Sequence, residues 1–566
     1  MKIDKITLKS GAQIELGKFT LLVGPNNVGK SQTLKDIHRK IVDGSEADTI
    51  LLKEILVNRP DTFEGLLEDL DVRPDAINVG HHTVDGITSN ANGNSMVRFQ
   101  LDHFRRNFES TPAADFTFQR LGKFRVFYMD SESRLSIAST CENFIPDENS
   151  PKTLLQALYG KFGKLDDILE NAFETTFGKK IRLDYSAGLK LRFAVAKNFG
   201  AIPADPREAY PLMTKFPSLE SQGDGFRSFV AVVLSLLLSK DKVVLLDEPE
   251  AFLHPEQARR LGRWMADHVE NFPCQVMIAT HNANFLAGVL AGRQPAAIFR
   301  LNRTDDETSF CPITAEATRA LSSSPILSSQ RVLEGIFARG VVVCEADSDR
   351  IVYNSVAIHE HDNQELLFVH AHNKQTIKDV VSLLKAASIP VAAIVDIDIL
   401  NSDADLSRLL GAFDAEVDHS ETLRLREQVA NHIEDRPENE VIADTRAAVV
   451  EFLAQLDRKE HTLSGAKGAL NRIRSESSKW SIVKTTGIAA LDEPARLLAE
   501  QAINKSEVIG LFIVPKGELE GWMDLGVRKN RWVVPALERI VEGNSPQDLA
   551  DFVKKVTLFV YGDNGS

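Results

Sequence analysis

The chain has 566 residues and a formal net charge of −14, and 43% of its residues are hydrophobic and 26% are charged. An ordinary domain holds about 150 residues, so this length predicts several domains with separate cores. The composition is that of a soluble globular protein. The longest apolar run, Phe229 to Leu238, is too short to span a bilayer, and the first residues show strand-like alternation. We therefore expect no membrane span and no targeting segment.

The cysteines and the net charge indicate which ligands and which cellular compartment suit this chain. The four cysteines lie far apart without a CxxC pair, which predicts neither zinc nor a disulfide framework and favours a reducing cytoplasm. Because the net charge is acidic, binding to DNA would need local basic patches. The candidates, with two possible stacking tryptophans, are Arg472, Arg474, Lys479, Lys484, Lys516, Arg528, Lys529, Arg531, Trp480 and Trp532. The alternative is a solvated mixed-charge face with two core tryptophans.

A phosphate-binding loop follows the first predicted strands, at residues 2–8, 12–16 and 19–23. The segment Gly24-Pro25-Asn26-Asn27-Val28-Gly29-Lys30-Ser31 matches G-x-x-x-x-G-K-S and precedes a predicted helix at 31–42. Gly24 and Gly29 would let backbone N–H groups face phosphate. Lys30 would reach the β and γ phosphates of ATP, and Ser31 would hold magnesium. The other residues assigned to this site are Asn26, Asn27 and Gln32. A plain glycine turn before a helix is the alternative.

Two further predicted strands end in polar residues. The apolar run 243–246 ends in Asp247-Glu248-Pro249-Glu250, and the run 275–279 ends in Thr280-His281. Asp247 would position magnesium, and Glu248 would orient or activate the attacking water. This order and spacing resemble ABC-type and SMC-like ATPase heads, which implies that His281 is a switch histidine sensing the γ phosphate. A lone histidine after a strand is more often structural, so the assignment of His281 depends on the motifs that accompany it.

A third ATPase feature lies upstream. Ser221-Gln222-Gly223-Asp224-Gly225 precedes a helix-like apolar run and resembles the signature motif of ABC-type heads. The resemblance implies a head-to-head homodimer in which Ser221 and Gly223 contact ATP bound to the opposite subunit. Unpaired N–H groups at a helix start suit a phosphate, and a simple helix cap is the alternative. We expect Arg134 to contact nucleotide or a neighbouring subunit, or to form a surface ion pair.

Two stretches separate these motifs. Residues 43–114 are polar and predict an irregular insertion with a flexible loop at 86–94. Residues 150–178 carry apolar side chains at helical spacing and predict a helical arm with a packing face. A serine cluster at 322–324 marks the boundary, so we place the ATPase domain at residues 1–320.

The second unit, residues 321–566, carries acidic residues behind short apolar strands. Glu345 follows the run 341–344, Asp349 comes four residues later, and Asp396 and Asp398 follow the run 391–395. A strand at 366–369 and a helix at 376–387 alternate with them, which predicts a parallel sheet. Clustered carboxylates are most easily kept ionised by a divalent cation, Mg²⁺ or Mn²⁺. In an extended D-x-D, Asp396 and Asp398 would face one side and share one metal or bridge two.

A glutamate after one strand and D-x-D after a later one resembles the Toprim pattern of topoisomerases, primases and the OLD (overcoming lysogenization defect) nucleases. Asp349 resembles a second metal ligand of the OLD branch. The strand-like run 508–514 leads into Pro515-Lys516-Gly517-Glu518-Leu519-Glu520, which is similar to the Lys-Gly-x-Leu-Glu segment of OLD-type domains. Lys516 would then stabilise charge on the scissile phosphate. Without the resemblance, it would be a loop lysine paired with Glu518 or Glu520.

The resemblance spans nearly the whole chain: an ABC/SMC-like P-loop ATPase head, then a Toprim domain, both of the α/β class, as in the Gabija and retron-associated defence nucleases. A charged helical insertion expected at 401–505 also resembles the OLD family. The chain departs from the Toprim pattern at Ala346 and at residues 371–374, Ala-His-Asn-Lys, where glycine is expected.

The resemblance implies a homodimeric or larger ATPase whose nucleotide state regulates a Mg²⁺- or Mn²⁺-dependent DNA endonuclease in defence against bacteriophage. A helicase or a retron reverse transcriptase would be a further partner. Two metals about 4 Å apart would activate water and stabilise the leaving oxygen. The main alternative is an ATP-driven DNA-binding clamp of the SMC or recombination-mediator type that does not cut. A topoisomerase or primase is disfavoured, because neither a recognisable nucleophilic tyrosine domain nor a zinc ribbon is present.

Overall fold

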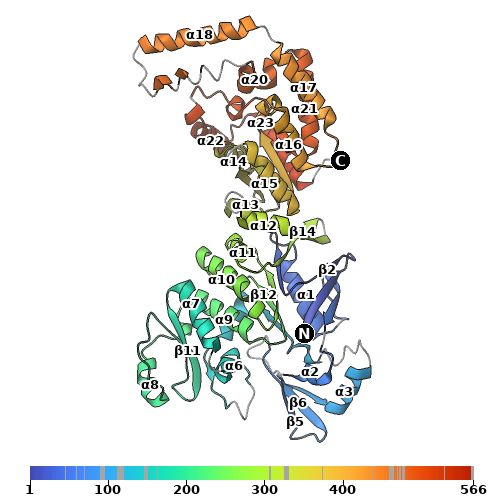
Figure 1. The fold of residues 1–566 in the computed structure, drawn as a ribbon, viewed down its shortest axis with the longest axis vertical. Coiled ribbons are helices and arrows are strands. Elements are labelled where there is room, and N and C mark those ends of the chain that lie inside the picture. Colours follow the sequence, from blue (N-terminus) through green and yellow to red (C-terminus); the bar gives the residue numbers. More distant parts are fainter. Residues whose placement is uncertain are drawn as a thin grey trace. The chain divides into compact units, whose positions relative to one another are not determined.

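The computed structural model describes residues 1–562 except for 45, 59, 69, 89–95, 111–119, 146–150, 162–163, 305–306, 324–329, 372–373, 436–437, 458–464, 468, 471–472, 474–478 and 528. The chain divides into two compact units, Met1–Ser324 and Pro325–Ser566 (Figure 1). Most of the expected loop at 86–94 lies outside the described residues, as do the basic residues Arg472, Arg474 and Arg528. Among the described helices, none is both long and apolar enough to cross a membrane.

A six-stranded sheet organises the first unit, in the order β15-β14-β3-β13-β12-β8. All neighbouring strands are parallel except β14 and β15. The parallel pairing brings the carboxyl ends of β3, β12 and β13 to one edge, which is where α/β sheets bind ligands. The bounds are β3 Phe19–Val23, β8 Val126–Met129, β12 Val243–Asp247, β13 Gln275–Ala279, β14 Ala297–Thr304 and β15 Glu307–Pro312.

Continuous apolar runs explain this sheet. Strands β3 and β13 are buried at every position, as parallel strands covered on both faces require. Helix α9 is buried from Ser228 to Leu238, which explains its nearly unbroken apolar sequence. The helices of this part of the unit are α1 Lys30–Val42, α5 Ser131–Ile137, α9 Asp224–Leu238, α10 Pro255–His268, α11 Ala283–Leu290 and α12 Ala315–Ser323.

The described residues of the stretch 43–114, which is predicted as an irregular insertion, form strands and helices instead. Strand β4 (Leu52–Asn58) pairs with β1 (Lys2–Leu8), which also pairs with β2 (Gln13–Glu15). Strands β5 (Asp71–Pro74), β6 (His81–Asp85) and β7 (Val97–Gln100) form a second antiparallel sheet. Its core is largely aromatic and draws on helices α2 (Phe63–Leu67) and α3 (Leu101–Ser110). Short strands whose few apolar residues meet only in three dimensions leave little periodicity in the sequence.

The stretch predicted as a helical arm, residues 150–178, holds two helices, α6 (Leu154–Gly160) and α7 (Lys164–Phe177). Phe173 and Phe177 of α7 contact the rings of Phe226 and Phe229 on α9, so the apolar stripe is a packing face. A small antiparallel sheet in the order β10-β11-β9 joins two strands that follow α7 to one strand that precedes α6 in the chain. Its bounds and those of the next helix are β9 Cys141–Glu142, β10 Lys180–Asp184, β11 Lys190–Ala196 and α8 Pro206–Met213.

The second unit is built on a parallel sheet in the order β17-β16-β18-β19. Strands β16 and β18 are buried at every position. The predicted strand at 508–514 is shorter than expected, because Val508 ends a helix and β19 spans only Leu511–Ile513. The other bounds are α13 Gln330–Glu334, β16 Gly340–Cys344, α14 Asp347–His361, β17 Leu366–His370, α15 Lys374–Ala386, β18 Val391–Val395, α22 Val533–Val541 and α23 Gln547–Tyr561.

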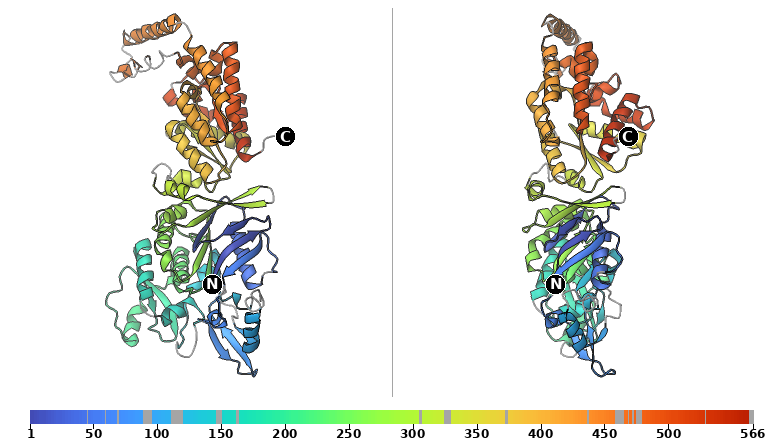
Figure 2. Two further views of the ribbon diagram at one scale, coloured as in Figure 1. Left: turned by 45° about the vertical axis from the view of Figure 1, so that its right-hand side comes forward. Right: turned by 90° about the vertical axis from the view of Figure 1, so that its right-hand side faces the viewer.

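Most of the described residues between β18 and β19, where a helical insertion is predicted, lie in helices (Figure 2). They are α16 Asp403–Phe413, α17 Ser420–Glu434, α18 Glu438–Asp457, α20 Ser481–Thr486 and α21 Glu493–Val508. Helices α17 and α21 pack side by side, with Leu425, Val429 and Ile433 of α17 buried. The buried face of α21 includes Ala495, Ala499 and Ala502, whose small side chains permit a close approach.

Candidate functional site

The nucleotide-binding loop joins β3 to α1 at the carboxyl edge of the first unit's sheet. Gly24 has φ +135°, and a Cβ there would lie 2.5 Å from the carbonyl oxygen of Leu301. Gly29 has φ +99°, and its Cβ would meet the side chain of Leu51 at 2.7 Å. Both positions therefore need glycine. Helix α1 starts without a side-chain cap, and uncapped N–H groups at a helix start suit a phosphate.

Lys30, Ser31 and Asp247 meet at this loop. The Ser31 hydroxyl donates to Asp247 Oδ1 at 2.7 Å, and Lys30 Nζ donates to the carbonyl oxygen of Gly24 at 2.8 Å. Burial lowers the pKa of Lys30 to about 8, against the opposite pull of nearby carboxylates. A hydroxyl and a carboxylate in direct contact beside a lysine are the donor set that a magnesium–nucleotide complex uses, so these residues fit that ligand.

Glu248 and His281 form an ion pair beside the loop. His281 Nδ1 lies 2.8 Å from Glu248 Oε1. Their hydrogen bond raises the pKa of His281 and lowers the pKa of Glu248. Glu248 has φ +51°, so the chain turns sharply where β12 ends. The structure thus brings together the residue predicted to activate water and the residue predicted to sense the γ phosphate.

The remaining predicted loop residues differ in their orientation. Asn26 and Asn27 are exposed, and Asn27 has φ +63°, a conformation that asparagine tolerates well. Gln32 donates from Nε2 to Asp36 Oδ1 at 2.7 Å, which turns its amide along α1. Of these three, the two asparagines are the ones left at the surface of the loop.

Arg134 on α5 is fully buried and holds the turn after β12. Its Nη1 and Nη2 donate to the carbonyl oxygens of Asp247 and Glu248 at 2.6 and 2.7 Å, and its Nε donates to Ser228 Oγ of α9 at 3.1 Å. Arg134 is therefore not a surface ion pair, and these contacts lie within its own chain. The sequence gives no signal for this role, because the guanidinium binds backbone carbonyls that any residue would offer.

The segment that resembles a signature motif begins helix α9. The Ser221 hydroxyl donates to the carbonyl oxygen of Ser218 at 2.7 Å, and Gly223 precedes the first helical residue without a side-chain cap. A Cβ at Gly225 would lie 2.6 Å from the carbonyl oxygen of Phe252. Phe252 has φ +70° and is half-exposed. The first turn of α9 therefore packs directly on the loop that follows Glu248.

In the second unit, Glu345, Asp396 and Asp398 meet at the carboxyl edge of the sheet. Each offers one carboxylate oxygen, and these atoms all lie within 4.8 Å of one another. Strands β16 and β18 pair with Cys344 opposite Ile394. Glu345 and Asp396 therefore follow their strands at nearly the same height along the sheet. Asp398 is not in an extended segment as predicted but in a 3₁₀ turn, Ile397–Asn401. Converging carboxylate oxygens fit a hard divalent cation.

Asp349 lies outside this group of three. It stands in the first turn of α14, where its Oδ2 accepts a hydrogen bond from the Ala346 N–H at 3.0 Å. Burial raises the pKa of Asp349, and the charge of Glu520 raises it further. Ala346 has φ −124°, which needs no glycine, so the departure from the Toprim pattern causes no strain here. Ala371 is buried, while residues 372 and 373 lie outside the described residues.

Two lysines of this unit have different carboxylate partners. Lys516 Nζ pairs with Asp548 at 2.7 Å, so the alternative pairing with Glu518 or Glu520 is not the one observed. Lys484 of α20 contacts the acidic group, with Nζ 2.9 Å from Asp398 Oδ2. The two residues are 86 positions apart in the chain. No local pattern links them, so the sequence placed Lys484 only in a general basic patch.

The two tryptophans proposed as stacking surfaces belong to the core. Trp480 is 6% exposed and Trp532 is 2% exposed. Trp532 Nε1 donates to the carbonyl oxygen of Met523 at 3.0 Å. Lys529 pairs with Glu518 and Glu520 at 2.8 and 3.3 Å. The alternative of two core tryptophans is therefore correct for this part of the chain.

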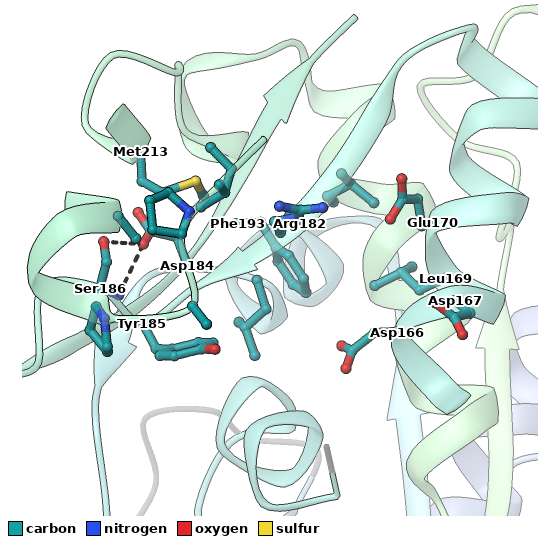
Figure 3. A pocket seen from close by; sticks show the side chains of 17 residues that line it. Asp166, Asp167, Leu169, Glu170, Arg182, Asp184, Tyr185, Ser186, Phe193 and Met213 are labelled. Carbon is teal, nitrogen blue, oxygen red and sulfur yellow. Dashed lines mark hydrogen bonds between the residues drawn. The ribbon is translucent and has the colours of Figure 1, made fainter. Parts of the chain in front are cut away.

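A cavity of about 400 Å³ lies in the first unit, between α7, β10, β11 and α8 (Figure 3). Apolar side chains such as Phe193 and Met213 line it together with acidic residues. Glu170 pairs with Lys180, and Asp184 pairs with Arg192. None of the predicted site residues lines this cavity, so the proposed chemistry lies elsewhere.

Two family models match the chain. Residues 207–287 match "AAA domain, putative AbiEii toxin, Type IV TA system", and residues 336–398 match "Overcoming lysogenization defect protein-like, TOPRIM domain". The chain is thus an ATPase domain followed by an OLD-like TOPRIM domain. The second match contains Glu345, Asp349, Asp396 and Asp398. The predicted α/β fold class and the predicted resemblance to the OLD family are confirmed.

A curated relative agrees with this assignment. The OLD nuclease of Thermus scotoductus (strain ATCC 700910 / SA-01) is 24% identical over 220 residues, which cover 35% of this chain and 40% of that protein. Solved SMC head domains also match. One bound to the C-winged helix domain of ScpA covers 56% of this chain and 98% of that chain, at 14% identity and TM-score 0.33. One from Thermotoga maritima covers 56% and 100%, at 14% identity and TM-score 0.29.

Both domain types imply ligands of known chemistry. An ATPase domain uses a nucleotide, and a TOPRIM domain uses a divalent metal. The carboxylate group of Glu345, Asp396 and Asp398 provides the ligand atoms for such a metal. The predicted use of a nucleotide and of a divalent metal is confirmed as a property of these two domain types.

Proposed function

We propose that this chain is an ATP-binding and ATP-hydrolysing, metal-dependent DNA endonuclease whose nucleotide state regulates cutting. The observation that carries the proposal is the meeting of three carboxylates within 4.8 Å at the edge of an OLD-like TOPRIM sheet. The same chain has a P-loop whose Ser31 contacts Asp247. Carboxylate groups of this kind hold the metals that serve phosphodiester hydrolysis.

In the ATPase domain, Lys30 would bind the β and γ phosphates, while Ser31 and Asp247 would hold Mg²⁺. Glu248 is ionised in the ion pair with His281, because the hydrogen bond lowers the pKa of Glu248. Glu248 can therefore accept a proton from a water molecule near the γ phosphate. His281 is the partner in that hydrogen bond. It can respond to the γ phosphate by breaking or keeping its hydrogen bond to Glu248.

In the TOPRIM domain, Glu345, Asp396 and Asp398 would hold Mg²⁺ or Mn²⁺, with Asp349 as a further ligand. When bound, the metal supplies activation of water and stabilisation of the leaving oxygen. The backbone between Asp396 and Asp398 is anchored to the loop after β19, since the Ile397 N–H donates to the carbonyl oxygen of Gly517 at 3.0 Å. Lys516 would have to leave its partner Asp548 before it could reach a scissile phosphate.

The proposed partners follow from the same domains. DNA is the substrate, and the ATPase domains would form a homodimer or larger assembly in which Ser221 and Gly223 meet the nucleotide of a second copy. Uncapped N–H groups at the start of α9 support that contact. A role in defence against bacteriophage in the cytoplasm, with a helicase or a retron reverse transcriptase beside it, is the biological extension of this proposal.

The nuclease is tested with supercoiled plasmid, with and without Mg²⁺ or Mn²⁺, in each nucleotide state. We expect metal-dependent nicking or cutting that is lost in Asp396→Ala, with Asp551→Ala, an exposed aspartate of α23, as the control. Binding of DNA without cutting in any nucleotide state would contradict the proposal and favour the SMC-like clamp.

The ATPase is tested by phosphate release. Lys30→Ala should abolish both binding and hydrolysis of ATP, because it removes the cation that faces the phosphates. Glu248→Gln should abolish hydrolysis while ATP still binds, because the amide cannot accept a proton. Unchanged turnover in either variant would remove that residue from the proposed site.

A further inference from the structure

Helix α20 places the ammonium group of Lys484 beside the acidic group of Glu345, Asp396 and Asp398. Lys484 Nζ lies 2.9 Å from Asp398 Oδ2, and the side chains of Lys484 and Asp398 are 43% and 18% exposed. The lysine thus reaches the carboxylates from the more open side, while Asp398 is mostly covered. This is a different lysine from the one that the loop motif predicts.

The backbone of Lys484 is held firmly beside this group. Gly517 has φ +99°, and a Cβ there would lie 2.2 Å from the carbonyl oxygen of Lys484. Gly487 has φ +73°, and its Cβ would lie 2.0 Å from the carbonyl oxygen of Pro515. The Ile488 N–H also donates to Pro515 O at 2.9 Å. Such close approaches admit only glycine, so the flexible side chain of Lys484 is the part that can move.

Electrostatics explains why a cation sits here. Carboxylate oxygens within 4.8 Å of one another repel when they are ionised. The ammonium of Lys484 offsets that repulsion at Asp398. A divalent metal would bind oxygens of these carboxylates at about 2.0–2.6 Å and would bring its two charges close to the ammonium. Because like charges at this range repel, Lys484 and the metal cannot both hold Asp398 well.

We propose that Lys484 is a counter-ion of the metal-free site and that the divalent metal must displace it from Asp398. This inference rests on the proposed metal-dependent nuclease and names the residue that sets how readily its site loads metal. Because the backbone of α20 stays fixed, the displaced ammonium remains near the carboxylates. An ammonium in that position can bind a phosphate of DNA.

The proposal is tested by Mn²⁺ binding to the full-length protein without DNA, measured by titration calorimetry or by the electron paramagnetic resonance of free Mn²⁺. Lys484→Met should bind Mn²⁺ about 3- to 10-fold more tightly than wild type, because a repelling charge is removed. Lys484→Arg keeps the charge and should stay near wild type. Lys505→Met is the matched control and should leave the affinity unchanged, since Lys505 is as exposed as Lys484 and pairs with Glu421.

Equal Mn²⁺ affinity in wild type and Lys484→Met would overturn the proposal, as would an equal gain in affinity in the control Lys505→Met. Asp396→Asn should remove the binding and so identify the site that is measured. Circular dichroism verifies folding, and Lys484→Gln is the second variant if the methionine variant unfolds. A protein that shows the Lys484 effect but never cuts DNA would uphold this inference and contradict the nuclease, so the two failures are distinct.

Discussion

A single buried carboxyl group beside the nucleotide loop ties stability to pH. Glu250 is 4% exposed, and Thr280 Oγ1 donates to its Oε1 at 2.6 Å. Burial raises the pKa of Glu250 to about 7, from an ordinary value of 4.5. The native state therefore holds this proton more tightly than the unfolded state does. Native stability falls as pH rises from about 4.5 to about 7 and stays lower above that range.

The substitution Glu250→Gln tests this sign, because glutamine copies the protonated form. At pH 5 the variant and wild type should unfold at similar temperatures. At pH 8.5 the variant should be the more stable, by an amount on the order of 3 kcal/mol. The measurement is thermal unfolding by calorimetry at both pH values, with Glu256→Gln, an exposed residue of α10, as the control. A pH-independent difference would contradict the assignment.

His281 offers a second prediction at the residue scale. Its hydrogen bond to Glu248 raises its pKa, so the ion pair adds stability at pH values below the ordinary histidine pKa of 6.5. That contribution is lost as pH rises through the raised value. Glu248→Gln should lower the pKa of His281 in an NMR titration of the ring protons. A pKa of His281 that stays the same in this variant would refute the pair.

Sequence reasoning at this scale succeeds where chemistry follows a local motif. Ser31 and Asp247 are predicted from two separate motifs, and the structure joins them at 2.7 Å. Lys484 is missed as a partner of Asp398 because their contact depends on how α20 packs after a long insertion. The position of Asp398 in a 3₁₀ turn is also missed, since a D-x-D pattern does not distinguish an extended segment from a turn.

At the scale of elements, the contact between α9 and the loop after β12 predicts a pair of glycine variants. Gly225→Ala would place its Cβ 2.6 Å from the carbonyl oxygen of Phe252, whereas nothing lies within 4 Å of a Cβ at Gly223. We expect Gly225→Ala to lower the free energy of unfolding by about 1–3 kcal/mol, as overpacking does. Thermal unfolding without nucleotide measures this, with Gly223→Ala as the matched control. Equal melting temperatures for Gly225→Ala and Gly223→Ala would show that the loop after β12 moves to admit the added methyl group at no cost in stability.

Long buried elements are predictable, while small ones are not. Strands β12, β13, β16 and β18 follow from continuous apolar runs that only a covered parallel sheet accommodates. The β5-β6-β7 sheet escapes prediction because its strands are four or five residues long and mostly half-exposed. The role of Arg134 between α5, α9 and β12 escapes for another reason, since its partners are mostly backbone atoms.

At the scale of the whole molecule, metal should stabilise the chain. A ligand that binds only the folded state adds about 2.7 kcal/mol when its concentration is 100 times its dissociation constant. We therefore expect Mn²⁺ to raise the temperature of an unfolding transition of wild-type protein measured by calorimetry. Asp396→Asn should remove that increase, while Lys30→Ala should retain it because Lys30 serves the other unit. A shift that survives in Asp396→Asn would place the metal elsewhere.

The strand order of the second unit also has a consequence for how the protein folds. Strand β19 lies beside β18 in the sheet, with Val395 opposite Ile513, although all the helices from α16 to α21 come between them in the chain. Pairing between strands so far apart is slow to form. Until β19 arrives, β18 has one unpaired edge next to Asp396, and such an edge invites pairing with other chains. A growing polypeptide therefore passes through a period in which it is prone to aggregate and has no fully supported metal site.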